Sequence, residues 1–402
     1  MKILAFSINP IYPQHITGGA SKHLVNIVRH LAEAGHSVTL LCAGNEALDS
    51  SFSLGEGVLV KPILPFHLPF PQPYAISPGD LALIAEIVGS ELQKHDRFYI
   101  HDGELLLPFL QTQVPTIISV RDNYYPESIL GTFINQPDAV ITVSPYSDAV
   151  VRASAGRVLE GLDERMHLVP NGLDPMVFNP ADTMEIRLEL AIPTDAGPIL
   201  LYPHRPELSK GLWRSLELLR RLVQEEGLLK ALLLMPMWLG EMESEDDRSN
   251  RKMIESWLDA HGLTGNVLMH RWLRQDQMAG YYSLGDLTLA LGYMPEAFGN
   301  VAYESLVCGT PSLVAKVGTH RTQLPDKLID KVDYGNDAQA QKAAVEILRA
   351  KKRISQEEVG AILEIFAYDR QLKAFERIIT QTVKKPVLQA RRKKGEVKTF
   401  VL

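Results

Sequence analysis

The chain has 402 residues, of which 46% are hydrophobic and 22% charged, with a formal net charge of −7. Its length predicts two domains of about 200 residues each, and its composition is typical of a globular enzyme rather than of a disordered or membrane-spanning chain. The acidic balance argues against a general nucleic-acid binder, which needs a basic face, and favours a small-molecule substrate.

The first half alternates apolar runs with helical segments. Residues 21–34 carry apolar side chains at helical spacing, and Gly35 ends this predicted helix. Apolar runs suited to buried strands occur at residues 2–8, 37–42, 98–101, 116–121 and 139–143. The alternation predicts a Rossmann-like parallel sheet.

Residues 61–79 interrupt this series with six prolines mixed with aromatic residues. Neither a helix nor a central strand tolerates such a mixture, so we expect a long surface loop. It could be a rigid connector, or its rings could contact an acceptor substrate.

A second series of strands follows the turn at Asn171-Gly172, at residues 198–203, 231–237, 266–270, 286–291 and 312–316. We therefore predict an α/β fold of two facing Rossmann-like parallel-sheet domains, with ligands bound in an interdomain cleft at the carboxyl ends of the strands. The expected domains are residues 1–182 and 183–370. A helix at about 371–383 is expected to pack back on the first domain, before a basic tail at 384–402.

The tail and the cysteines bear on location. The basic stretch Lys384–Lys398 suits a solvated tail or, alternatively, weak contact with an anionic membrane surface or acidic partner. Cys42 and Cys308 cannot build a disulfide framework or a Cys-based zinc site, and Cys308, for which no paired base is indicated, is interpreted as a packing residue. No apolar run is long enough for a secretory signal or a membrane span. We expect a cytoplasmic protein, with any membrane contact peripheral.

Residues 296–311 (EAFGNVAYESLVCGTP) carry the strongest chemical signal. Gly299 allows close approach of a ligand just before a helix to about Val307, whose free N–H groups suit a diphosphate. Glu296 and Glu304 lie eight residues apart, about 12 Å along a helix. This is roughly the reach from the ribose to the sugar of a sugar nucleotide, so Glu304 could accept from ribose hydroxyls and Glu296 from a sugar hydroxyl.

This segment resembles the E-x7-E signature of the family-4 type of retaining nucleotide-sugar glycosyltransferases, which have the GT-B fold. Other pieces match in the same order, namely GGASKHLVNIVRHLAEAGHSVTLL, VPNGLDPMVFNP and LLYPHRPELSKGL, and the resemblance covers residues 1 to about 380. It implies transfer of a sugar from a nucleoside-diphosphate sugar to a hydroxyl of a glycan, lipid or small molecule, with retention and without a cofactor. It implies catalytic roles for Arg205, Lys210 and Glu296, and donor binding by Gly18, Gly19, His101, Phe298, Gly299, Asn300, Val301 and Glu304.

Arg205 and Lys210 make physical sense as a pair. Arginine offers phosphate a planar fork and lysine a compact charge, so together they could stabilise a leaving diphosphate without a metal. Taken alone, both could equally be surface charges.

The first-domain residues are less specific. Gly18 and Gly19 could let a ligand approach the backbone or could simply form a turn. His101 resembles the family's histidine that contacts the transferred sugar, although a histidine at a strand end is often structural.

The sequence departs from the family after residues 231–237, where Trp238 and Leu239 replace a glycine-rich turn. The acidic cluster Glu243–Asp247 could suggest a metal site, but we expect a solvated loop. A dehydrogenase is disfavoured because Gly55-Glu56-Gly57 has no third glycine. A sugar-nucleotide epimerase, a glycan phosphorylase and a non-catalytic regulatory relative stay open as alternatives.

Overall fold

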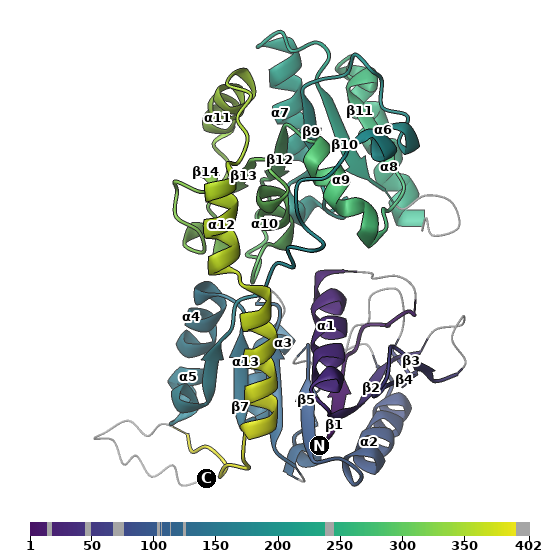
Figure 1. Cartoon of the computed structure of the whole chain (residues 1–402), viewed down its shortest axis with the longest axis vertical. Helices are drawn as coiled ribbons and strands as arrows, with labels where there is room; N and C mark the ends of the chain where they lie inside the picture. The colour runs from purple at the N-terminus through teal and green to yellow at the C-terminus, as the bar shows by residue number, and fades with distance from the viewer. Residues whose placement is uncertain are drawn as a thin grey trace, which may run out of the picture. The chain divides into compact units, whose positions relative to one another are not determined.

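The computed structural model describes residues 1–13, 18–44, 50–66, 76–102, 105, 107–112, 114–123, 126–237 and 245–390. The chain divides into two compact units, Met1–Pro170 with Leu372–Leu402, and Asn171–Gln371 (Figure 1). By contacts, the first unit therefore ends at Pro170, before the boundary at 182 that the sequence suggested, and the chain returns to it at Leu372.

The first unit is built on one sheet, which has eight strands among the described residues, in the order β3-β4-β2-β1-β5-β6-β7-β8. All neighbouring strands are parallel except β3 and β4. The strands are β1 (Lys2–Phe6), β2 (Ser37–Ala43), β3 (Phe52–Ser53), β4 (Val58–Leu64), β5 (Arg97–Ile100), β6 (Thr116–Val120), β7 (Ala139–Thr142) and β8 (Met166–Leu168). The helices are α1 (Gly19–Glu33), α2 (Pro78–Leu92), α3 (Pro126–Asn135), α4 (Pro145–Ala153) and α5 (Ala155–Val158), joined by most of α13 (Tyr368–Gln381).

The proline-rich segment is shorter than the sequence suggested, because strand β4 includes Pro62 and helix α2 begins at Pro78. Pro62 is tolerated because β3 pairs only as far as Val60, and the β2–β4 register shifts just after Pro62. Pro78 starts a helix because its missing N–H is not needed there and Ser77 caps the first turn. Residues 67–75, which include the aromatic residues Phe70 and Tyr74 that could contact an acceptor, lie outside the described residues.

The second unit has a sheet in which every neighbouring pair is parallel, in the order β11-β10-β9-β12-β13-β14. Its strands are β9 (Ile199–Leu201), β10 (Leu232–Pro236), β11 (Val267–His270), β12 (Leu287–Ala290), β13 (Ser312–Ala315) and β14 (Asp330–Val332). Its helices are α6 (Met184–Glu189), α7 (Leu212–Gln224), α8 (Glu245–Ala260), α9 (Met278–Leu284), α10 (Asn300–Val307), α11 (Asp337–Arg349) and α12 (Gln356–Ile365). The prediction of two parallel-sheet α/β domains is confirmed.

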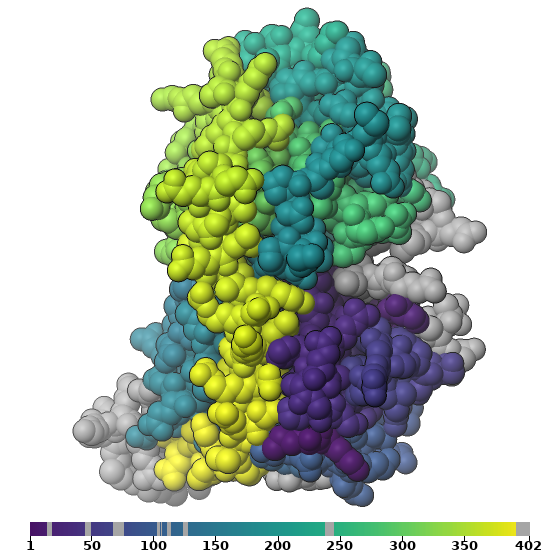
Figure 2. All heavy atoms as spheres, viewed as in Figure 1, coloured from purple at the N-terminus to yellow at the C-terminus, as the bar shows by residue number. Residues whose placement is uncertain are grey.

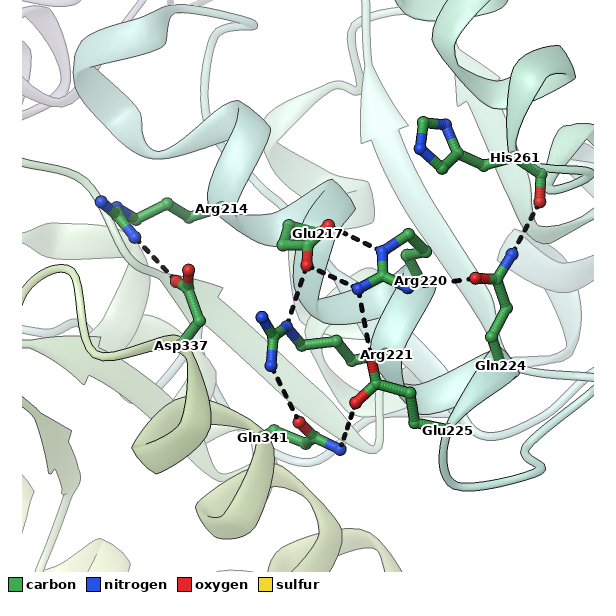
Figure 3. A network of polar contacts seen from close by, with 9 residues as sticks. All are labelled: Arg214, Glu217, Arg220, Arg221, Gln224, Glu225, His261, Asp337 and Gln341. Atoms are coloured by element: carbon green, nitrogen blue, oxygen red, sulfur yellow. Dashed lines mark hydrogen bonds and ion pairs between the residues drawn. The ribbon is translucent and has the colours of Figure 1, made fainter.

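Helix α7 shows how the second unit holds its outer layer. Its leucines at 212, 216, 219 and 222 are buried in the core of this unit. On its polar face, Glu217 accepts from Arg220 and Arg221, and Arg221 reaches Gln341 of α11 (Figure 3). Arg214 also joins α11 through Asp337, at 2.7 Å. The two helices are therefore tied together by polar contacts as well as by the core.

Helix α13 packs within the first unit. In Figure 2 its yellow residues lie directly against the purple residues of α1, where His30 Nε2 lies 2.9 Å from Glu376 Oε2. Phe375 makes an edge contact with Tyr99 of the sheet, with ring centroids 6.1 Å apart.

The start of the basic tail contacts the first unit, because the buried Asp138 carboxylate accepts from Lys384 Nζ and from the Lys385 backbone N–H. The Lys384 side chain nevertheless stays 42% exposed. Residues 391–402 lie outside the described residues, so contact of the tail with an anionic surface stays a prediction. Within the described part of the chain, none of the helices has both the length and the apolar character needed to cross a bilayer.

Candidate active site

The predicted donor residues of the second unit lie at the carboxyl ends of two adjacent strands, β9 and β12. Arg205 and Lys210 follow β9, and Glu296 follows β12. Strand β9 pairs with β10 on one side and β12 on the other, so the direction of strand order reverses here. Such switch points are where ligands bind in open α/β sheets.

Two glycines let the loops after these strands touch. A Cβ on Gly211, which has a φ of +86°, would lie 2.5 Å from the backbone of Gly292. A Cβ on Gly292 would lie 2.4 Å from the Ser209 carbonyl oxygen. The Met294 N–H donates to that same oxygen at 3.1 Å. Glycine is therefore needed at both positions to bring Lys210 beside the loop that carries Glu296.

Lys210 and Glu296 form an ion pair, with Nζ 3.0 Å from Oε1. Burial alone would raise the pKa of Glu296, but the charges of Lys210, His204 and His320 outweigh it and lower the pKa to about 2. The pKa of Lys210 is raised, because Glu296 outweighs the effect of its burial. Glu296 is thus held as a carboxylate that can accept but not donate hydrogen bonds.

Arg205 lies in the same loop as Lys210, after β9. Its Nε lies 3.1 Å from Glu207 Oε1, and its side chain is one-third exposed. The guanidinium adds a second positive charge to the switch point.

Helix α10 begins beside this pair. Gly299 precedes it in the left-handed conformation, at a φ of +84°, and no side chain caps the helix. The first N–H groups of an α-helix have no partner within the helix, so this end can receive an anion. Asn300 and Val301 form its half-buried first turn. The Phe298 ring points into the core against Tyr303, so only its backbone could serve a ligand.

Glu304 lies on the buried side of α10, with 5% of its surface exposed. Its Oε2 accepts a hydrogen bond from the Tyr282 hydroxyl at 3.0 Å. Burial and the Glu304 carboxylate raise the pKa of Tyr282, so this hydroxyl keeps its proton and fixes the carboxylate in place. Tyr282 was not singled out from the sequence, and its position in YYSLGD gives no signal of this contact.

The sequence reasoning also missed His204 and His320, two buried histidines that would lower the pKa of Glu296 when protonated. His204 directly precedes Arg205 in the loop after β9, and this adjacency was the only available signal. Its Nε2 lies 3.2 Å from the Leu289 carbonyl oxygen, and burial lowers its pKa to about 4. The imidazole is therefore neutral at pH 7.

In the first unit, the predicted residues also meet at a switch point, between β1 and β5. Gly18 precedes α1 in an extended conformation with open space where a Cβ would be, and Gly19 is the first residue of the helix. His101 is fully buried after β5. Its Nε2 lies 2.9 Å from the Ala20 carbonyl oxygen and its Nδ1 2.7 Å from the Tyr99 hydroxyl. His101 thus anchors the first turn of α1, and its contact with a sugar stays a prediction.

Three further sequence features can be located in part. Trp238, Leu239 and the first two residues of the acidic cluster lie outside the described residues. Glu245–Asp247 form the first turn of α8, where carboxylates favour the positive end of the helix, rather than the loop that was expected. Cys308 is buried at the end of α10, and burial raises its pKa, which suits a packing residue.

Family models match both halves of the chain. Residues 17–177 match Glycosyltransferase Family 4, and residues 185–357 match Glycosyl transferases group 1. A D-inositol 3-phosphate glycosyltransferase of Thermobispora bispora is 23% identical over 373 residues, which cover 86% of this chain and 85% of that one. The enzyme of the same name from Xylanimonas cellulosilytica is 29% identical over 203 residues. The match covers 48% of this chain and only 46% of that enzyme.

Solved structures share the architecture. The sucrose-phosphate synthase of Thermosynechococcus elongatus superposes with a TM-score of 0.77 at 18% identity, covering 94% of this chain and 98% of that one. The Anabaena protein HepE, solved in complex with UDP and glucose, gives a TM-score of 0.68 at 18% identity, covering 95% and 99%. At such identity the likeness establishes the fold alone.

Proposed function

The chain belongs to the family-4 type of glycosyltransferases, and on that premise we propose that it moves a sugar from a nucleoside-diphosphate sugar to an acceptor hydroxyl with retention of configuration. The observation that supports this most is the Lys210–Glu296 pair beside the uncapped start of α10. It joins a cation, a carboxylate and a helix N-terminus at one switch point, as a charged diphosphate with an attached sugar requires.

The diphosphate would lie at the start of α10, beside Gly299. Lys210 and Arg205 would neutralise the charge that develops on the leaving diphosphate, an effect that acts in the transition state more than in the ground state. We propose that no metal is needed, because two cations and a helix N-terminus already supply positive charge.

The two glutamates would hold the other parts of the donor. Glu304, fixed by Tyr282 at 3.0 Å, would accept from the ribose hydroxyls. Glu296 would accept from a hydroxyl of the transferred sugar. Its pairing with Lys210 makes it a poor nucleophile, which argues against a covalent glycosyl intermediate on this residue.

Retention would then follow from attack on the face that the diphosphate leaves. In this front-face displacement a phosphate oxygen takes the proton of the acceptor hydroxyl while the bond from the sugar to the diphosphate breaks. Proton NMR of the first-formed product would test it. An inverted anomeric configuration would exclude the proposed mechanism.

The donor and acceptor can be sought by direct binding. A thermal-shift screen with UDP, GDP and ADP should give one clear stabilisation, since a ligand at 100 times its Kd adds about 2.7 kcal/mol. UDP is the first to test because HepE was solved with it, and D-inositol 3-phosphate is the first acceptor because of the relatives' names. An epimerase would turn over the sugar nucleotide without an acceptor, a phosphorylase would need phosphate, and a regulatory relative would bind without turnover.

A further inference from the structure

A histidine outside the family signature lies against the start of helix α10. His320 belongs to a short 3-10 turn, Gly318–Arg321, that follows β13, and only 6% of its surface is exposed. The neighbouring Thr319 N–H donates to the Glu296 carbonyl oxygen at 3.2 Å. This turn is therefore fastened to the loop that carries Glu296.

The imidazole ring of His320 lies directly over Gly299. A Cβ built on Gly299 would come within 2.3 Å of His320 Cε1 and 2.8 Å of Nε2. Only glycine, which has no Cβ, fits beside this ring. The Cε1–Nε2 edge of the imidazole thus adjoins the residue that precedes α10, a helix whose start no side chain caps.

The second ring nitrogen of His320, Nδ1, has a hydrogen-bond partner. Nδ1 of His320 lies 3.3 Å from the Tyr303 hydroxyl, and the two rings meet edge to face at 5.7 Å. When the Tyr303 hydroxyl donates this bond, a neutral imidazole carries its proton on Nε2. Among the residues that the structure describes, Nε2 has no hydrogen-bond partner.

The electrostatic surroundings suit a neutral donor. Burial is the main cause that lowers the pKa of His320, and the nearby Lys210 and Lys331 lower it further, while Glu296 opposes them. The ring therefore brings an N–H group to a crowded site without adding another cation beside Lys210. Nε2 is not among the described side-chain atoms that are both fully buried and unpaired, so it keeps some access to solvent, and a phosphate oxygen can accept a hydrogen bond from it.

We propose that His320 is a phosphate-binding residue of the donor site, whose Nε2–H donates to the diphosphate at the start of α10. This inference rests on the proposed function, because it takes the diphosphate to lie there. It assigns the 318–321 turn to the donor site together with the E-x7-E segment, and it explains why Gly299 is flanked by an imidazole instead of an aliphatic side chain.

Calorimetric titration with UDP and with uridine would test the role. His320→Phe keeps a ring of similar size and removes the donor, so UDP binding should weaken about tenfold, as expected for a hydrogen bond to a charged group, while uridine binding stays the same. His320→Gln places an amide N–H near the position of Nε2 and should recover part of the loss. His261→Phe is the matched control, because His261 lies just after α8 with its ring stacked on Trp257. This variant should leave both affinities unchanged.

Three outcomes separate the possibilities. Equal UDP affinity in the wild type and in His320→Phe would overturn the inference alone. Equal loss of UDP and uridine binding would also overturn it, because His320 would then act through packing. A wild-type chain that binds none of UDP, GDP and ADP would overturn the proposed function itself. If His320→Phe fails to fold, His320→Gln is compared with the wild type instead. A role in packing alone predicts no change in UDP affinity that is not matched by the same change in uridine affinity.

Discussion

Replacing Lys210 by methionine should destabilise the second unit, because it leaves Glu296 without its cation. Only 20% of the Glu296 side chain is exposed, and its partner Nζ lies 3.0 Å away. The pKa of Glu296 is lowered from 4.5 to about 2, a difference worth about 3 kcal/mol. Breaking a buried ion pair from one side costs about 3 to 5 kcal/mol, so we expect a loss of about 3 kcal/mol.

The sign of the pH dependence follows from the same pair. The pKa of Glu296 is lower in the folded chain than in the unfolded chain, so its stabilisation is complete above about pH 4.5 and is lost as the pH falls toward 2. The difference between wild type and Lys210→Met should therefore be largest near neutral pH and should shrink in acid.

Tryptophan fluorescence during urea unfolding can measure this loss in one unit. All four tryptophans, at 213, 238, 257 and 272, fall within Asn171–Gln371. With a slope of about 2 to 3 kcal/mol per molar urea, a loss of about 3 kcal/mol lowers the midpoint by about 1 M. The fluorescence signal therefore isolates the second unit.

Two further variants complete the experiment. Lys210→Met with Glu296→Gln should regain most of the stability, because no buried charge is then left alone. Lys230→Met is the exposed control, since Lys230 and Asp195 pair at 2.7 Å with side chains 64% and 68% exposed, and its urea midpoint should stay close to that of the wild type because exposed ion pairs contribute little. Equal midpoints for Lys210→Met and Lys230→Met would refute the reasoning.

Three other outcomes are expected. Burial lowers the pKa of His270 to about 4, so stability should fall as the pH drops from about 6.5 to 4, and His270→Phe should reduce the difference between urea midpoints at pH 7 and pH 5; an unchanged difference would exclude this residue as the cause. Glu217→Ala should cost about 0.5 to 1 kcal/mol in dilute buffer and less in 1 M NaCl, by the same fluorescence assay, and equal losses in both would contradict an electrostatic origin. Sugar transfer, measured by the release of nucleoside diphosphate, should continue in the presence of EDTA. An absolute need for Mg²⁺ or Mn²⁺ would contradict the proposed metal independence.

The sequence predicted the central strands well, because a parallel strand covered on both faces reads as a continuous apolar run. It missed β3 and β4 in the first unit, and β4 alternates exposed and buried residues around Pro62. It also missed β8 and β14, which have three residues each and contain His167 or the pair Asp330-Lys331. Strands β3, β8 and β14 each lie at the edge of their sheet and pair with one neighbour only. A short edge strand buries little apolar surface, so its sequence carries no comparable pattern.

The site was predictable where its chemistry is local in sequence. Glu296, Gly299 and Glu304 share one loop and helix, so a single segment carried the signal. The partner of Glu296 lies 86 residues away, and that of Glu304 lies 22 residues away. Their distances depend on which strands become neighbours, and one sequence without relatives does not fix that order.

These partners give the two glutamates different electrostatic surroundings. Glu296 faces the ammonium of Lys210, which is the main reason that its pKa is lowered and that it stays ionised. Glu304 faces the neutral hydroxyl of Tyr282 and is almost completely buried. A carboxylate beside cations suits the sugar end of the donor, where charge develops as the diphosphate leaves. A carboxylate fixed by a neutral hydroxyl suits a ribose diol, which keeps the same charge throughout the reaction. The two glutamates of the E-x7-E segment are therefore the same residue type in two different chemical environments. The tyrosine and the lysine that distinguish these environments come from other elements of the same unit.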